Sequence, residues 1–149
     1  MMSNIDTLLN NISASSFYEK VRSFLHNVVE WAETQPEIRG IALVGSFARG
    51  AGSESSDIDL VLTTTDPDFY LKAPEWITHF GEPLRQATHD LWGKVRSIRV
   101  LYDGLPEVEF GWTTKDWVES PIDEGTQRVI LDGLIVLYDP DGDFAFLAE

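Results

Sequence analysis

Two aspartates, Asp57 and Asp59, form the pattern with the clearest chemical meaning. They occur in Ser56-Asp57-Ile58-Asp59-Leu60, where acidic and apolar residues alternate. Residues two apart on a β-strand point to the same face, so both carboxylates are expected on one side, with Ile58 and Leu60 in the core. Adjacent carboxylates repel each other unless a cation lies between them, and oxygen ligands favour Mg²⁺ or Mn²⁺. The pair therefore predicts a site for a divalent metal ion.

A candidate phosphate-binding segment precedes the aspartates. The apolar run 41–44 stops at Gly45, as a buried strand does where the backbone turns sharply, and a phosphate can approach a glycine closely. A short helix opening at Ser46 would direct its free N–H groups toward that gap. Ser46 adds a hydroxyl donor, and Arg49 adds a delocalised cation suited to phosphate oxygens. The segment predicts anion binding.

Each of these two pieces alone also has an ordinary structural interpretation. Gly-Ser occurs in many turns, and Asp-x-Asp occurs on the exposed part of many strands. Here an apolar run precedes each piece, and ten residues separate Ser46 from Asp57. Phosphoryl transfer with two metal ions about 3.5–4 Å apart requires carboxylates beside a phosphate site. The combination therefore favours that chemistry over two unrelated turns.

A third acid follows a predicted hairpin. Residues 94–103 alternate as a strand does, and Asp103-Gly104 is a strong tight-turn signal, so the next run is expected to pair back. In 106–112 the large apolar residues share one face, which leaves Glu107 and Glu109 on the other. Glu109 is then either an exposed residue of an antiparallel pair or part of a site. The apolar face consists of Val108, Phe110 and Trp112.

The remaining pattern predicts an α/β (α+β) fold, with a mixed, twisted sheet of about five strands and helices packed against it. An apolar stripe predicts a long helix from Ser16 to a stop before Pro36. Residues 82–91 are polar and irregular and predict a loop over the site, and 134–138 predict a final buried strand. We expect one domain over 1–149, with residues 1–13 as a mobile lead-in.

Composition limits the class of function. The 149 residues include 43% hydrophobic residues and no cysteine, so a thiolate nucleophile, a thiolate metal site and a disulfide framework are excluded. The formal net charge of −14 repels a phosphate backbone, which argues against binding of long nucleic acids. The sequence contains neither a signal-peptide pattern nor an apolar run of the roughly 18 residues that a membrane span requires. We therefore expect a cytoplasmic protein.

The segment Gly45-Ser46-Phe47-Ala48-Arg49-Gly50, followed by Ser56-Asp57-Ile58-Asp59-Leu60, resembles the signature of the nucleotidyltransferase superfamily that includes DNA polymerase beta. It is most similar to the small bacterial members, namely the minimal nucleotidyltransferases and the aminoglycoside and lincosamide adenylyltransferases. The resemblance implies a polymerase beta-like fold in which Gly45, Ser46 and Arg49 hold the β- and γ-phosphates. It also implies that Asp57 and Asp59 hold Mg²⁺ or Mn²⁺.

In that superfamily a third acid on a neighbouring strand completes the metal site, and Glu109 is the residue of this chain that the resemblance assigns to it. The family often has aspartate there. The longer glutamate leaves three roles open: metal ligand, base for the acceptor hydroxyl, or both. Glu107 has the same strand parity and is the alternative candidate, although it lies at the strand end beside Pro106.

The function implied by the resemblance is nucleotidyl transfer, with AMP from ATP as the most common case in the family and a hydroxyl group of a small molecule or a protein as acceptor. Two other interpretations stay open. One is an antitoxin-type protein that binds a helical toxin of the HEPN type, and the other is a nucleotide sensor without transfer activity. Larger relatives build the wall of the acceptor pocket from an additional helical domain. For this chain we expect either that a second subunit forms that wall, in a homodimer or a complex with a helical partner, or that the acceptor is a protein.

Overall fold

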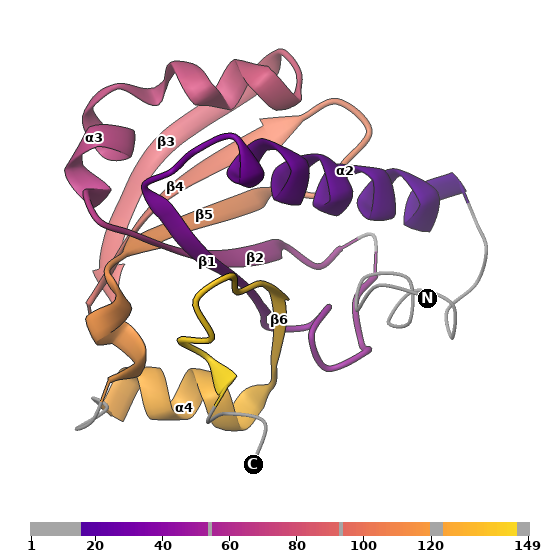
Figure 1. Ribbon diagram of the computed structural model, residues 1–149. Coiled ribbons are helices and arrows are strands. Elements are labelled where there is room, and N and C mark those ends of the chain that lie inside the picture. The colour runs from indigo at the N-terminus through magenta and orange to yellow at the C-terminus, as the bar shows by residue number, and fades with distance from the viewer. Residues whose placement is uncertain (1–15, 54, 93, 120–123, 146–149) are drawn as a thin grey trace.

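A computed structural model describes residues 16–53, 55–92, 94–119 and 124–145 of the chain. Its centre is a six-stranded sheet in the order β3-β4-β5-β2-β1-β6 (Figure 1). Strands β2 and β5 are parallel, and every other neighbouring pair is antiparallel. The strands are β1 (Ile38–Val44), β2 (Ile58–Thr64), β3 (Pro83–Trp92), β4 (Val95–Tyr102), β5 (Val108–Thr113) and β6 (Leu134–Tyr138).

One face of the sheet is covered by the long helix α2 (Ser16–Glu33), together with α3 (Pro67–Lys72) and the 3-10 helix η1 (Pro74–Phe80) (Figure 1). The predicted apolar stripe of α2 is buried in this layer, and so are the side chains that alternate on β2 and β5. Phe110 has no exposed surface, and Trp112 stacks on Tyr70 of α3 with ring centroids 4.3 Å apart. The predicted apolar faces are thus confirmed.

The opposite face of the sheet carries a smaller apolar cluster built around Trp117 and Phe144. Trp117 belongs to the 3-10 helix η2 (Lys115–Val118), and α4 (Glu124–Asp132) lies on the same side through Val129. Because side chains alternate along a strand, the residues of β2, β5 and β4 that do not enter the main core point to this face. They include the acids of the candidate site.

The fold class predicted from the sequence is confirmed, with six strands in place of about five. The loop predicted over 82–91 is wrong, because this stretch forms β3 and pairs with β4. As the outer strand of the sheet, β3 has little surface to bury, so apolar alternation is not required there. The final strand β6 is also at an edge, and all five of its residues are only partly buried. The lead-in predicted for residues 1–13 lies outside the described residues.

Among the described helices, none is both long enough and apolar enough to cross a membrane.

Candidate active site

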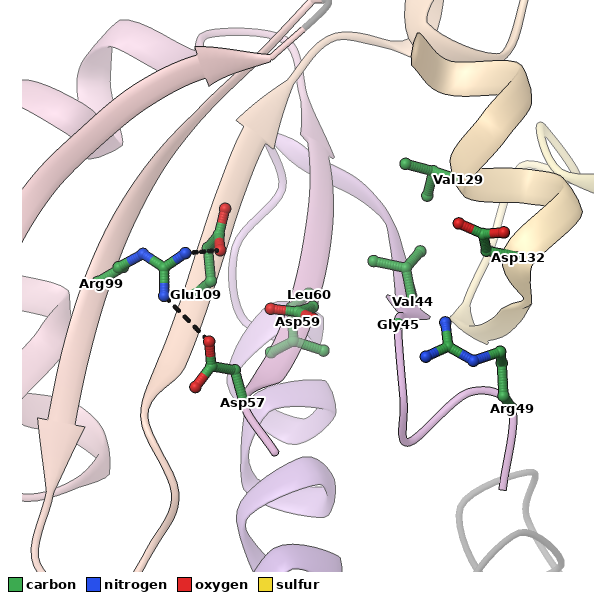
Figure 2. A pocket seen from close by; sticks show the side chains of 10 residues that line it. All are labelled: Val44, Gly45, Arg49, Asp57, Asp59, Leu60, Arg99, Glu109, Val129 and Asp132. Atoms are coloured by element: carbon green, nitrogen blue, oxygen red, sulfur yellow. Dashed lines mark hydrogen bonds and ion pairs between the residues drawn. The ribbon is translucent and has the colours of Figure 1, made fainter. Parts of the chain in front are cut away.

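The site begins as a row of side chains across four neighbouring strands. Strand register pairs Arg99 of β4 with Glu109 of β5, Glu109 with Asp59 of β2, and Asp59 with Val44 of β1. Adjacent strands lie about 4.8 Å apart, so paired residues on one face are direct neighbours. Asp57 precedes β2 and points into the same space (Figure 2). The fold thus brings together all three acids that the sequence singled out.

These acids line a pocket of about 300 Å³. Its other walls come from the end of β1, from the turn after it and from α4 (Figure 2). Of the six predicted site residues, Ser46 alone is absent from the lining, although it directly follows Gly45. The lining residues are Val44, Gly45, Arg49, Asp57, Asp59, Leu60, Arg99, Glu109, Val129 and Asp132.

Gly45 is required where β1 ends against Asp59. Its φ angle is +76°, and a Cβ atom placed there would lie 2.4 Å from Oδ2 of Asp59. Both the backbone conformation and the space therefore exclude a side chain. The absence of that side chain lets the backbone lie directly against the carboxylate of Asp59. The close approach of a phosphate at Gly45 stays a prediction.

The helix predicted to open at Ser46 is wrong in form, because residues 46–50 make a succession of turns. The amide of Ala51 donates to the carbonyl oxygen of Ser46 at 2.9 Å, and that of Arg49 donates to Gly45 at 3.2 Å. Gly50, with a φ of +74°, ends this turn segment before a helix can extend. Anion binding here would use the turn and the Arg49 side chain, without the dipole of a helix.

Arg49 lies across the pocket from the acids (Figure 2). Its Nη2 donates to Oγ of Ser46 at 3.2 Å. A Cβ atom at Gly133, between α4 and β6, would lie 2.9 Å from Cγ of Arg49, so the arginine stem passes close to that backbone. The guanidinium is thus held at the opening between the turn and α4.

Arg99 is the pocket residue with the most charged contacts, and the sequence did not single it out. Its Nη1 lies 3.0 Å from Oδ2 of Asp57 and 2.9 Å from Oε1 of Glu107, and its Nη2 lies 3.0 Å from Oε2 of Glu109. The Asp103-Gly104 turn is the sequence feature that could have identified Arg99. Residues of β4 and β5 pair symmetrically about Gly104, and this register places Arg99 opposite Glu109. The hydrogen bond from Arg99 holds the pKa of Glu107 below its usual value.

Asp59 is the acid with the strongest electrostatic perturbation. The pKa of its carboxyl group is raised to about 6, chiefly by burial and then by the charges of Glu109 and Asp57, while the charges of Arg99 and Arg49 act in the opposite direction. A buried carboxylate whose pKa is raised by neighbouring negative charges lacks sufficient positive charge around it. Such a set of oxygens is stabilised by an added cation.

Comparison with protein families decides the identity of this arrangement. The family model described as streptomycin adenylyltransferase matches residues 19–99, which is more than half of the 149 residues. The chain belongs to this family. The matched residues include Gly45, Arg49, the two aspartates and Arg99, but they end before Glu109. The resemblance to polymerase beta-like nucleotidyltransferases is thereby confirmed, and the place of Glu109 rests on strand register.

Solved structures share the fold at low sequence identity. A CCA-adding enzyme in complex with CTP aligns with 99% of the chain at 16% identity and a TM-score of 0.52. A cytoplasmic RNA terminal U-transferase aligns with 85% at 16% identity and a TM-score of 0.50, and an aminoglycoside 6-adenyltransferase from Bacillus subtilis aligns with 67% at 15% identity and a TM-score of 0.49. The chain spans 35%, 38% and 41% of these three proteins, respectively. No curated protein matches the chain in sequence.

The chemistry of the acids fits the divalent metal ion that the family fold implies. Asp57, Asp59 and Glu109 offer only carboxylate oxygens, the ligands that Mg²⁺ and Mn²⁺ prefer. Within the described ranges no three acids are yet grouped closely enough to enclose an ion, and Arg99 contacts two of the three. The three carboxylates are therefore suitable ligands for a metal ion. In this structure, however, two of them are positioned to pair with Arg99.

Proposed function

We propose that the protein transfers a nucleoside monophosphate, AMP from ATP, to a hydroxyl group of an acceptor, with Mg²⁺ or Mn²⁺. The observation that supports this most is the meeting of two sets of groups in one pocket. Asp57, Asp59 and Glu109 line the pocket together with Gly45, which adjoins Asp59, and Arg49, which lies across from the acids (Figure 2). Nucleotidyl transfer needs both sets within reach of the same phosphate group.

The acids are the groups proposed to hold the metal ions. Asp59 is paired with Glu109 in the strand register and also interacts electrostatically with Asp57, which supports a role for its carboxylate in sharing ions with both neighbours. Metal ions bound there would lower the pKa of the acceptor hydroxyl and neutralise charge on the leaving pyrophosphate. Glu109, whose side chain is 13% exposed, is also proposed as the base that accepts the proton of that hydroxyl.

The turn after β1 is the part proposed to hold the β- and γ-phosphates. Gly45 presents backbone without a side chain beside Asp59, and Arg49 presents a guanidinium across the pocket. A pocket of about 300 Å³ is at the lower end of the range for ligand sites, so it suits the phosphates and metal ions more than a whole nucleotide with its acceptor. The nucleoside and the acceptor would then extend beyond it.

The acceptor is proposed to be a small molecule or a protein that carries positive charge. With a formal net charge of −14, the chain repels nucleic acid and attracts cationic groups. Asp132 of α4 adds an exposed carboxylate on the wall opposite Glu109. A second copy of the chain or a helical partner would complete the acceptor side.

Binding of ATP is expected to depend on divalent metal, because the acids and the phosphates must share a cation to lie together. Isothermal titration of ATP in Mn²⁺ should give a Kd at least about tenfold lower than the same titration in EDTA. AMP, which lacks the β- and γ-phosphates, is the matched control and should bind weakly under both conditions. An ATP affinity unchanged by EDTA would rule out the proposed site.

A further inference from the structure

Arg99 lies beside the acids of the site, on oxygen atoms of Asp57 and Glu109 that the proposed function assigns to metal (Figure 2). Its guanidinium contacts three carboxylates at 2.9 to 3.0 Å, namely those of Asp57 before β2, Glu107 before β5 and Glu109 within β5. Two of these three residues are the proposed metal ligands. The side chain of Arg99 is 27% exposed, so these contacts are partly shielded from water.

A guanidinium and a divalent ion repel each other when both lie on the same carboxylates. Like charges a few ångströms apart interact strongly at the effective dielectric of a protein surface. An ion ligated by the oxygens that Arg99 engages, Oδ2 of Asp57 and Oε2 of Glu109, would lie within a few ångströms of the guanidinium in its present position. Metal binding and the present position of Arg99 therefore compete.

Arg99 contacts three acids and does not form a bidentate pair with any one of them. Nη1 serves both Asp57 and Glu107, Nη2 serves Glu109, and Nε is buried without a hydrogen-bond partner among the described residues. A purely structural arginine usually matches its planar fork to one carboxylate. The arrangement is instead the one expected of a positive charge that balances a cluster of negative charges.

We propose that Arg99 takes the place of the metal ions in the metal-free protein and must leave Asp57 and Glu109 before a divalent ion binds there. This inference rests on the proposed function, because it concerns the same acids. The arriving nucleotide supplies phosphate oxygens as new partners for a guanidinium. Metal alone is therefore expected to bind weakly, and metal together with ATP is expected to bind well. Arg99 acts as a positioning residue that couples the two binding events.

The test measures Mn²⁺ binding without nucleotide, by the loss of the free Mn²⁺ signal in electron paramagnetic resonance. Arg99→Gln is expected to lower the Kd for Mn²⁺ at least about tenfold, because the competing cation is gone. The matched control is Arg85→Gln, which removes the same unit of charge. Arg85 lies 3.2 Å from Glu107 with a side chain 69% exposed, and it does not line the pocket. Its Kd should stay within about twofold of the wild type.

The melting temperature gives an independent readout. Metal-free Arg99→Gln should melt below the wild type, because its acids repel one another, and Mn²⁺ should raise its melting temperature more than that of the wild type. If this variant does not fold, Arg99→Lys keeps one positive charge without the planar fork, and it is expected to lower the Kd about threefold.

The Mn²⁺ titrations distinguish an error about Arg99 from an error about the metal site itself. If the wild type binds Mn²⁺ with ATP but Arg99→Gln, or Arg99→Lys in its place, binds Mn²⁺ alone no better than the wild type, Arg99 does not compete with metal and the inference is overturned. If neither the wild type nor any variant binds Mn²⁺ with or without ATP, the proposed metal site itself is absent and both statements fall.

Discussion

Asp59→Asn is expected to abolish nucleotidyl transfer and to stabilise the metal-free protein at pH 7 to 8. The two effects have one cause, because Asp59 is a partly buried carboxylate beside two other acids. The amide has nearly the same shape but no charge, so it cannot replace the carboxylate as a metal ligand. It also no longer repels Asp57 and Glu109.

The gain in stability should depend on pH with a definite sign. Folding raises the pKa of Asp59 from 3.8 to about 6, so the folded protein favours the protonated form. The stability of the wild type is therefore highest below about pH 4 with respect to this group, and it is lost as pH rises through 6. Asp59→Asn has no carboxyl group to ionise at this position, so its stability does not fall in this pH range for that reason. The difference in free energy of unfolding should be near zero at pH 4 and roughly 1–3 kcal/mol at pH 7.

Chemical denaturation of the wild type and the variant in EDTA, at pH 4 and at pH 7.5, measures this difference. Asp116→Asn is the control for the loss of one negative charge, because Asp116 is exposed in η2 and does not line the pocket. It should change stability by less than about 0.5 kcal/mol at either pH. A marked destabilisation of Asp59→Asn at pH 7.5 would instead mean that this carboxylate makes structural hydrogen bonds.

Glu109→Gln is expected to lower the rate of transfer by about 10²- to 10⁴-fold while the affinity for ATP falls only modestly. Glu109 lies beside Asp59 in the parallel register of β2 and β5, so the substitution removes a carboxylate from the proposed metal site. Gly45 and Arg49, which are proposed to hold the phosphates, are unaffected. Single-turnover rates and ATP titrations in Mn²⁺ separate these two effects.

Glu107→Gln is the matched control, with the same chemical change two residues earlier. Glu107 contacts Arg99 and Arg85 but does not line the pocket. Its rate of transfer should stay within about threefold of the wild type, a small effect for a residue with no part in the transition state. If Glu107→Gln were inactive and Glu109→Gln active, the third carboxylate would have to be reassigned to the end of β5.

The sequence predicted the part of the site that local patterns determine. Alternation in β2 and β5 places Asp59 and Glu109 on the face opposite the main core, because Ile58, Leu60 and Phe110 have to be buried. The apolar run that stops at Gly45 predicted the sharp turn of the backbone after β1, where the φ angle of Gly45 is +76°. These inferences depend only on a period of two and on turn chemistry.

Other parts of the site depend on contacts between distant segments. No local pattern indicates that α4 closes the pocket with Val129 and Asp132, because that helix is placed by its apolar contacts on the sheet. The sequence predicted a loop where the structure has β3, because an edge strand buries little apolar surface and does not need apolar alternation. Arg99 was visible on the correct face of its strand, but its role appears only when the hairpin register brings it to Glu109.

The most direct test of nucleotidyl transfer uses ATP labelled on either the α- or the γ-phosphate, with Mg²⁺ and a set of cationic small molecules and proteins as acceptors. The wild type should transfer label from the α-phosphate alone and release pyrophosphate, whereas Asp59→Asn should transfer none. Label transferred from the γ-phosphate would contradict the account. So would binding of ATP or of a helical partner without any transfer from the α-phosphate, since the protein would then act as a sensor or as an antitoxin-type binder.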